Sequence, residues 1–323
     1  MVRFLLFSFS LLFFTCTRQN SRPDQTDMPQ PHTETTKPVA IPAFDGARAF
    51  SHLTAQTAFG PRTPNSQAAR ECLGYLNEKL QTTADTVVLQ EFTHAGYDGV
   101  QLRLTNVFAS FRGTGSDRIL LIAHWDSRPR AEQDEHKERR NEGIPGANDG
   151  ASGVAVLLEI ASLLKSSPPP VGVDILLTDG EDYGLEGDLD NYFLGARHFV
   201  RTKPVNYVPR FGILLDMVGD TYLEIPKEYY SVQFAPDIVD LVWKKAHELG
   251  FPQFVDEPGD PVSDDHLPFN EAGIKTIDLI DFNYPDPTNR FWHTHQDTPD
   301  KCSPESLNAV GTVLVNVVYS LRP

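Results

Sequence analysis

Residues 118–126 read Arg-Ile-Leu-Leu-Ile-Ala-His-Trp-Asp, and they indicate the type of fold. The apolar run 119–122 predicts a strand that is buried on both faces, as strands of parallel sheets are. His124 and Asp126 follow where this strand should end. In open α/β sheets, function collects beyond the carboxyl ends of the strands. This edge of the predicted sheet is therefore the place to look for a site.

The same pattern recurs on both sides of this stretch. Further buried strands are expected at 171–177, 211–218 and 275–280, and looser strands at 87–92 and 102–111. Helical spacing of apolar residues predicts helices at 47–59, 66–80, 151–164, 236–249 and 304–321. Asn65 or Ser66 could cap the second helix. Strands that alternate with helices predict a single α/β domain with three α/β/α layers and a central, mixed, mostly parallel twisted sheet.

The composition is that of a globular protein with an acidic surface. Of 323 residues, 40% are hydrophobic, which is enough for one large core. The 44 acidic and 28 basic residues give a formal net charge of -16. This charge repels phosphate backbones, so nucleic acid is not an expected partner. It is compatible with a cationic substrate, such as the ammonium group of a peptide.

Residues 1–16 predict an export signal. Arg3 precedes the apolar run 5–14, which is short for a membrane span. Cys16 ends the run as in a bacterial lipoprotein signal, with plain secretory cleavage nearby as the alternative. We therefore expect an exported, periplasmic protein that is anchored to a membrane through lipid on Cys16.

The polar, proline-containing segment 17–43 predicts a disordered tether, which leaves 44–323 as the folded domain. Within that domain, Cys72 and Cys302 lie far apart in the sequence and in no metal-ligand spacing. A disulfide between them and two buried free thiols are both compatible with the sequence.

Acidic and imidazole side chains follow four predicted strands and open one predicted helix. They are His124, Asp126, Asp149, Glu181, Asp182, Asp216 and His293. A single residue of this kind is usually a cap or a solvated loop residue, but their joint occurrence at successive strand ends predicts one site. Imidazole and carboxylate ligands without thiolates suit a catalytic Zn²⁺ with an open coordination position.

Glu181 and Asp182 are adjacent acids, which often simply face water. Here they follow a buried strand, where neighbouring side chains point in different directions. One of them can then bind a metal while the other faces the substrate. A carboxylate that lies close to zinc without binding it can transfer protons.

Taken together, these motifs resemble the zinc-dependent exopeptidase superfamily. Within it, the chain is similar to the animal-type glutaminyl cyclases (glutaminyl-peptide cyclotransferases), which include bacterial members. The resemblance covers residues 50–321 and is carried by His124-Trp-Asp126-Ser, Asn148-Asp149-Gly-Ala-Ser-Gly, Asp179-Gly-Glu181-Asp182, Asp216, Ser263-Asp264-Asp265-His266 and Trp292-His293-Thr.

The resemblance implies an enzyme that cyclises the N-terminal glutamine of peptides or proteins to pyroglutamate, with release of ammonia. One zinc ion per chain would be held by the positions that match Asp149, Asp182 and His293. Glu181 matches the general acid and base of the cyclases.

Three further positions match residues that surround the catalytic centre of the cyclases. Asp216 and Asp264 match two carboxylates of a hydrogen-bond network behind the site. Trp292 matches an aromatic wall of the substrate pocket, although an ordinary core residue is the alternative. A flat indole suits the aliphatic part of a glutamine side chain.

A two-zinc aminopeptidase is the main alternative, because His124 and Asp216 match ligands of a second metal. The doubled acid Asp264-Asp265 and the position of Trp292 favour the cyclase, in which the second-metal positions stay unoccupied. A non-catalytic binding module on the same scaffold is a second alternative, and Glu181 beside a full ligand set argues against it.

The sequence also departs from the family pattern. Asp182 stands where the superfamily usually carries Glu, and Gly187 lies near the position of a pocket Trp in the animal cyclases. One wall of the pocket is thus unassigned. We expect Asp126 to orient His124, and His266 and His295 to be structural.

Overall fold

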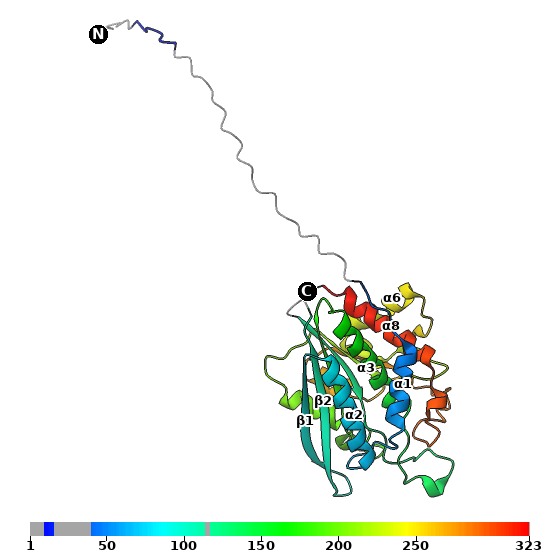
Figure 1. The fold of residues 1–323 in the computed structure, drawn as a ribbon. Coiled ribbons are helices and arrows are strands. Elements are labelled where there is room, and N and C mark those ends of the chain that lie inside the picture. Colours follow the sequence, from blue (N-terminus) through cyan, green and yellow to red (C-terminus); the bar gives the residue numbers. More distant parts are fainter. Residues whose placement is uncertain (1–9, 16–39, 114–116, 323) are drawn as a thin grey trace, which may run out of the picture. The chain divides into compact units, whose positions relative to one another are not determined.

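The computed structural model describes residues 10–15, 40–113 and 117–322. Residues 10–15 form no helix or strand, and residues 40–322 belong to one compact unit (Figure 1). Cys16 and most of the predicted tether lie outside the described residues. Within the described ranges, we find no helix with the length and apolar character needed to cross a membrane.

Six strands form the central sheet, in the order β1–β2–β4–β3–β5–β8. Their bounds are β1 Thr86–Ala95, β2 Gln101–Phe111, β3 Arg118–His124, β4 Gly172–Thr178, β5 Gly212–Asp216 and β8 Thr276–Ile280. The β4–β3, β3–β5 and β5–β8 pairs are parallel, whereas β2 is antiparallel to both β1 and β4. The prediction of a mixed, mostly parallel sheet is therefore confirmed.

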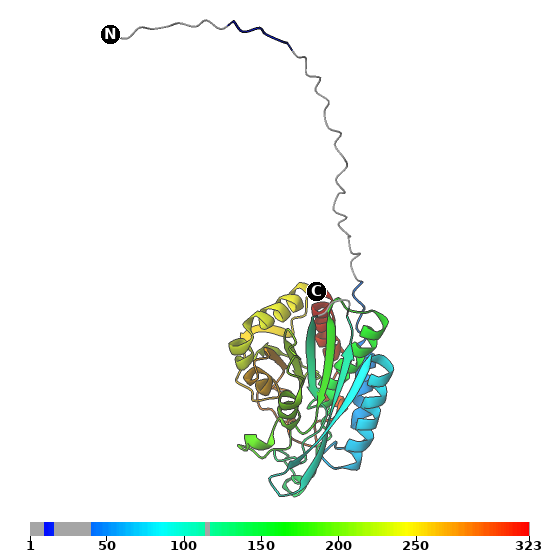
Figure 2. The same ribbon diagram turned by 90° about the vertical axis from the view of Figure 1, so that its left-hand side faces the viewer.

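Helices cover both faces of this sheet (Figure 2). On one face, α3 (Ala151–Ser166) contacts β3 and β5, and α1, α2 and α8 pack on α3. On the other face, α4 (Leu194–Thr202) contacts β2 and β4, while α7 (His266–Glu271) contacts β5 and β8. The predicted α/β/α layers are thus present.

The remaining elements are α1 Gly46–Thr57, α2 Gln67–Thr83, α5 Tyr229–Phe234, α6 Pro236–Leu249, α8 Pro304–Ser320, β6 Ile225–Lys227 and β7 Phe254–Pro258. Three single-turn 3-10 helices lie at Lys137–Arg139, Leu189–Asn191 and Pro299–Lys301. The strands β6 and β7 pair in a separate two-stranded sheet, and both α5 and α6 contact β8.

Strand β3 shows why the central strands read as continuous apolar runs. Successive side chains of a strand point to opposite faces. Leu121 and Ala123 belong to the core cluster that includes α1, α3 and α8, whereas Leu120 and Ile122 pack in the cluster with residues of α4 and α7. Because both faces are covered, every position of the strand favours an apolar residue.

The predicted helix boundaries agree with the structure where a capping residue or a proline marks them. The Ser66 hydroxyl accepts a hydrogen bond from the Ala69 amide at 2.9 Å and caps α2. Helix α6 begins at Pro236 and ends before Gly250, as predicted. Cys72 and Cys302 are buried free thiols, so the disulfide alternative does not hold.

Candidate metal centre and active site

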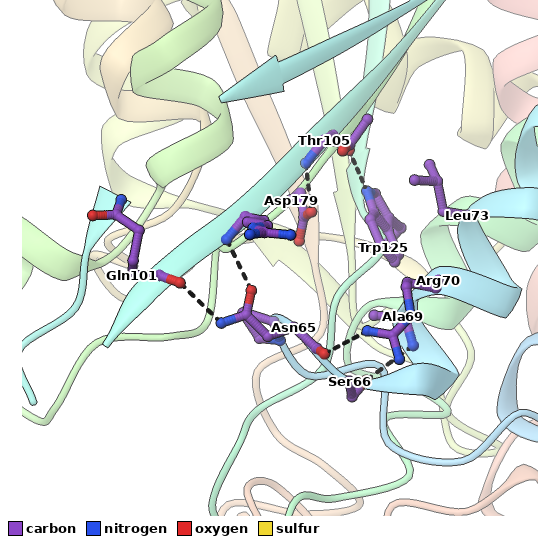
Figure 3. A pocket seen from close by; sticks show the side chains of 11 residues that line it. Asn65, Ser66, Ala69, Arg70, Leu73, Gln101, Thr105, Trp125 and Asp179 are labelled. Carbon is purple, nitrogen blue, oxygen red and sulfur yellow. Dashed lines mark hydrogen bonds between the residues drawn. The ribbon is translucent and has the colours of Figure 1, made fainter. Parts of the chain in front are cut away.

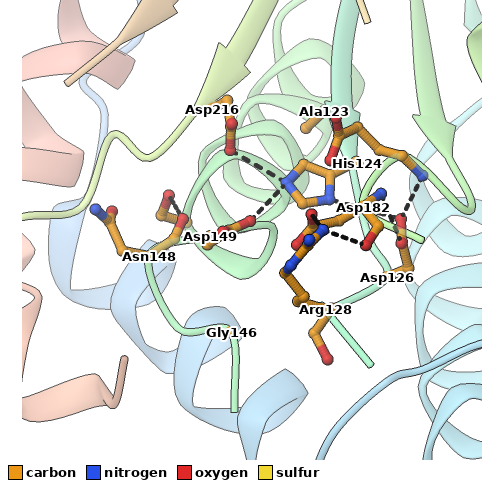
Figure 4. Close-up of polar contacts among 12 residues, drawn as sticks. Ala123, His124, Asp126, Arg128, Gly146, Asn148, Asp149, Asp182 and Asp216 are labelled. Atoms are coloured by element: carbon orange, nitrogen blue, oxygen red, sulfur yellow. Dashed lines mark hydrogen bonds and ion pairs between the residues drawn. The ribbon is translucent and has the colours of Figure 1, made fainter. Parts of the chain in front are cut away.

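The carboxyl ends of the parallel strands bring the predicted site residues together. His124 is the last residue of β3, and Asp216 is the last residue of β5. Asp182 follows β4 after a short turn, and Asp149 precedes Gly150, the N-cap residue of α3. Figure 4 shows Asp149, Asp182 and Asp216 around the His124 imidazole. The strand-end rule therefore located this group of side chains from the sequence.

Gly150 allows α3 to begin next to the end of β3. Its φ is +94°, in the region that favours glycine. A Cβ at this position would lie 2.5 Å from the Asp126 carbonyl oxygen and 3.0 Å from His124 Cε1. The Asp149-Gly150 pair thus places a carboxylate beside the imidazole.

Asp149, Asp182 and His293 form a first set of possible metal ligands. His293 Nε2 lies 3.6 Å from Asp149 Oδ2 and 3.4 Å from Asp182 Oδ1. All three side chains are buried, and their ligand atoms lie within 4.8 Å of one another. Asp182 Oδ2 is buried and has no hydrogen-bond partner among the described residues. An unpaired buried carboxylate oxygen is the kind of group that a cation satisfies.

His124, Asp149 and Asp216 form a second set. His124 Nε2 lies 3.3 Å from Asp149 Oδ1 and 3.1 Å from Asp216 Oδ1. Asp149 therefore directs one oxygen to each set. Burial opposes protonation of His124, but the negative charge of Asp216 and the contacts with its other carboxylate neighbours raise its pKa well above the usual value.

Asp126 lies beside His124, as expected, and it also holds the neighbouring loop. Its Oδ1 lies 3.5 Å from His124 Nδ1, but that nitrogen has no hydrogen-bond partner among the described residues. Its carboxylate instead accepts hydrogen bonds from the amides of Glu181, at 3.2 Å, and Asp182, at 3.3 Å. Asp126 thus fixes the loop that carries both acids.

Glu181 lies in the same buried region as the first set. Burial is the largest cause that raises its pKa well above the usual value, and the negative charges of Asp182 and Asp264 add to it. Burial and the nearby Asp216 and Asp265 raise the pKa of Asp264 in the same direction. The surroundings of both carboxyl groups therefore favour their protonated forms.

A small cavity of about 80 Å³ opens onto this group of residues. Glu181, Asp264 and the first set all line it. The indole of Trp292 stacks on the His293 imidazole, with ring centroids 3.6 Å apart, and meets Phe282 edge-on at 5.1 Å. Trp292 is only partly buried, so it is a wall of the cavity rather than an ordinary core residue.

The sequence did not identify the rest of this wall. Tyr192 and Phe282 line the cavity together with Trp292. Tyr192 comes from the acidic loop that contains Gly187, and no periodic pattern marks it. The wall that was unassigned in the sequence is thus supplied by two other aromatic rings.

Asp297 also supports a possible ligand, although no sequence pattern marks it. It accepts hydrogen bonds from the amides of Asn148, at 2.8 Å, and Asp149, at 3.1 Å. The Tyr284 hydroxyl donates to the same carboxylate at 2.8 Å. Asp297 therefore ties the loop after His293 to the start of α3.

His266 and His295, which the sequence predicts to be structural, lie outside the cavity lining. His295 Nδ1 lies 2.8 Å from Asp134 Oδ2 and links two loops. His266 is fully buried, 3.5 Å from Glu228 and 3.9 Å from Asp278. Both positions agree with a structural role.

A larger hollow of about 420 Å³ is lined by Trp125, Thr105 and Asp179 (Figure 3). Trp125 Nε1 donates to the Thr105 carbonyl at 3.0 Å, and the Thr105 amide donates to Asp179 at 2.7 Å. None of the possible metal ligands lines this hollow. The smaller cavity is therefore the candidate active site.

Comparison with known families matches residues 106–318 to peptidase family M28. The chain belongs to peptidase family M28. The resemblance seen in the motifs is thereby confirmed, since glutaminyl cyclases and zinc-dependent exopeptidases are both found among its relatives.

Two solved structures illustrate this M28 relationship. Glutaminyl cyclase of Bacteroides thetaiotaomicron, bound to N-acetylhistamine, is 40% identical and matches 88% of this chain and 100% of that chain, with a TM-score of 0.84. A Zn-dependent exopeptidase from Parabacteroides distasonis is 36% identical over 87% of this chain and 100% of that chain, also with a TM-score of 0.84.

Two curated relatives represent the two activities. Glutaminyl-peptide cyclotransferase-like protein of Mus musculus is 26% identical over 290 residues, which are 78% of this chain and 70% of the relative. Aminopeptidase YwaD of Bacillus subtilis is 30% identical over 213 residues, which are 63% of this chain. The chain spans only 41% of the length of that aminopeptidase.

These relationships and the donor atoms agree on the metal. A zinc-dependent M28 neighbour and two buried groups of imidazole and carboxylate donors indicate a zinc enzyme. The donor set is free of thiolates and includes the unpaired Asp182 oxygen, so the residues present fit zinc.

Proposed function

We propose that this M28 protein cyclises N-terminal glutamine of peptides or proteins to pyroglutamate. The observation that carries this proposal is the buried Glu181 carboxyl group, which faces a small aromatic-walled cavity beside the Asp149, Asp182 and His293 set. The cavity suits one folded glutamine residue better than an extended peptide. The 40% identical glutaminyl cyclase supports the same conclusion.

One zinc ion would be held by Asp149, Asp182 and His293. When bound, zinc supplies a Lewis acid for the side-chain amide carbonyl of the substrate. In this proposal, His124 and Asp216 hold no second metal. Their direct contact at 3.1 Å lets them support Asp149 from behind.

The protein's own residues then move protons and orient the substrate. The α-amino nitrogen forms a bond with the side-chain Cδ of the same residue, and the bond from Cδ to the amide nitrogen breaks. Glu181 accepts the proton that the amine loses and donates one to the departing ammonia. Asp264 and Asp216 lie behind it in the carboxylate network.

The aromatic wall makes the intramolecular attack possible. Nucleophile and electrophile belong to one residue, so the enzyme mainly folds the side chain back and excludes water. Trp292, Phe282 and Tyr192 line the cavity in which this takes place.

A two-zinc aminopeptidase is the second candidate function. The observation that favours it is the position of Asp149 between the two possible ligand sets, with one oxygen directed to each. The match to an aminopeptidase supports this alternative.

Mass spectrometry of a Gln-initiated peptide distinguishes the two candidates. After incubation with the zinc-loaded protein, a cyclase yields a peptide that is lighter by one ammonia, with every peptide bond intact. Release of free glutamine would identify a peptidase and refute the proposal. Metal analysis gives an independent criterion, because the cyclase is expected to hold one zinc per chain and the peptidase two.

The pH dependence of cyclisation follows from the nucleophile. A peptide α-amino group titrates near pH ~8, and only its uncharged form attacks. We therefore expect kcat/KM for a Gln-peptide to increase from neutral to mildly alkaline pH. A profile that is flat across this range would contradict attack by the amine.

We further propose that the protein is exported to the periplasm and anchored through lipid on Cys16. The support is the apolar run 5–14 followed by Thr15 and Cys16. In a bacterial host, the full chain should label with radioactive palmitate and sediment with membranes, whereas Cys16→Ala should do neither. An unlabelled wild-type chain would refute lipidation.

A further inference from the structure

Arg128 brings a guanidinium group into the interior beside the metal site. It lies in the loop after β3, four residues beyond His124, and its side chain is 1% exposed. A buried cation is costly unless charged and polar partners compensate it. The partners of Arg128 therefore indicate what it does.

Its first partner is the possible zinc ligand Asp182. Nη1 of Arg128 donates to the Asp182 carbonyl at 2.9 Å and to Asp182 Oδ1 at 2.6 Å. The same nitrogen thus holds both the backbone and the side chain of one residue. Asp126 holds the Asp182 amide from the same loop, so the orientation of Asp182 is fixed on three sides.

The hydrogen bonds from Arg128 determine which Asp182 oxygen remains available to a metal ion. Oδ1 is occupied by Arg128 and lies 3.4 Å from His293 Nε2, whereas Oδ2 is buried without a hydrogen-bond partner. Asp182 is also one methylene shorter than the glutamate usual at this position. Because the Asp182 side chain is short, it has little freedom to reach a metal ion, and neighbouring residues have to set its direction.

The second partner is the cavity wall. Nη2 of Arg128 donates to the Tyr192 hydroxyl at 3.0 Å, and the guanidinium carbon lies 5.5 Å from the centre of the Tyr192 ring. The outer side of the guanidinium is held by Glu132, which accepts from Nε at 2.9 Å. One side chain therefore connects a metal ligand with a wall of the substrate cavity.

We propose that Arg128 is a positioning residue that adapts the site to the short Asp182 arm and holds Tyr192 against the substrate. The proposal rests on the metal site proposed above. It assigns to one buried guanidinium both the orientation of a zinc ligand and the placement of the wall that the sequence left unassigned.

Zinc affinity and the spectrum of the Co²⁺-substituted protein test the first half of this proposal. Arg128→Met should weaken zinc binding about 10- to 100-fold in a chelator competition, as loss of a group that orients a ligand does. The visible absorption of its Co²⁺ form should change, because that absorption reports ligand geometry. Arg128→Lys keeps the positive charge but replaces the planar guanidinium fork with a single ammonium group, so its zinc affinity should be intermediate.

Kinetics with a Gln-peptide test the second half. Tyr192→Phe removes only the hydroxyl that accepts from the Arg128 guanidinium, so KM should rise about tenfold, because a hydrogen bond to a charged group is worth more than a neutral one. Zinc affinity and the Co²⁺ spectrum should stay as in the wild type. Arg130→Met is the matched control for Arg128→Met and should leave zinc affinity unchanged. Arg130 donates to Tyr97 and to the Tyr183 carbonyl rather than to Asp182.

The outcomes separate this inference from the proposed site. Wild-type protein that binds no zinc overturns the metal site itself. If the wild type binds zinc, and Arg128→Met binds it with equal affinity and gives the same Co²⁺ spectrum, then only the role of Arg128 is overturned. If Arg128→Met does not fold, Arg128→Lys decides: wild-type zinc affinity, spectrum and KM in that variant overturn the inference.

Discussion

Glu181 and Asp182 are neighbours in the chain but differ in their electrostatic surroundings. Burial disfavours the charged form of both. For Asp182, the Arg128 guanidinium and the His293 imidazole outweigh burial and hold its pKa below the usual range. For Glu181, burial acts together with the charges of Asp182 and Asp264, and its pKa rises. One residue is thus suited to be an anionic ligand and the other to carry a proton.

Glu181→Gln is the substitution that tests this division of roles. Glutamine has nearly the same shape but cannot accept and return a proton. We expect kcat for a Gln-peptide to fall about 10²- to 10⁴-fold, the usual contribution of a general acid and base. Zinc content should not change, because Glu181 is outside the ligand set. Wild-type turnover in this variant would remove Glu181 from the mechanism and would favour a non-catalytic binding module.

At the same scale, the sequence identified the ligand candidates but not their supports. His124, Asp149 and Asp216 could be located because each adjoins a strand or helix end that apolar patterns reveal. Arg128 and Tyr192 have no such signal, since their importance comes from contacts across 54 and 64 positions of the chain. Long-range contacts of this kind are formed only by the folded chain.

Among the elements, the predictable ones are long or bounded by strong signals. Helix α6 starts at a proline and ends before a glycine, and the buried strands contain continuous apolar runs. The short helices α5 and α7, with six residues each, were missed because one and a half turns show no period. They nevertheless matter, because α7 begins directly after Asp264-Asp265, and Asp264 lines the cavity.

The start of α3 provides a test at the scale of an element. Gly150→Ala places a methyl group 2.5 Å from the Asp126 carbonyl oxygen at a positive φ. We expect a loss of stability of several kcal/mol by strain and overpacking, and weaker zinc binding because Asp149 is displaced. Stability would be measured by urea denaturation and zinc affinity by chelator competition.

Gly187→Ala is the control for this substitution. Gly187 also has a positive φ, +82°, but no atom lies within 4 Å of its added Cβ. Gly187→Ala should lose about 1 kcal/mol of stability, because only the backbone conformation is unfavourable for alanine, and its zinc affinity should not change. Equal losses in both variants would mean that the close approach of α3 to β3 is not what constrains Gly150.

The whole molecule buries an unusual number of acids, and this has a consequence for stability. Burial raises the pKa of Asp265, Asp281 and Asp297 to about 7 each. In the unfolded chain, such groups titrate near pH ~3.9. Between these values the folded state binds more protons than the unfolded state, so stability falls as pH rises. The metal-free protein should therefore be more stable at pH 5 than at pH 8.

Asp281 isolates this effect, because it is absent from both possible ligand sets. It is buried and accepts hydrogen bonds from the amides of Glu224, at 2.8 Å, and Asn283, at 3.1 Å. A pKa of about 7 corresponds to at most about 4 kcal/mol, present below pH ~4 and lost as pH rises through about 7. Asp281→Asn retains an acceptor and cannot ionise, so its stability should depend less on pH.

The measurement is urea denaturation of the EDTA-treated protein at several values between pH 5 and pH 8. The difference in unfolding free energy across this range should be smaller in Asp281→Asn than in the wild type by up to about 3 kcal/mol, because the contribution is lost over about two pH units, from pH 5 to about 7. Asp240→Asn, on the exposed side of α6, should leave the difference unchanged. If both variants follow the wild-type profile, Asp281 is ionised in the folded protein throughout, and the pH dependence must come from the acids that surround the metal site.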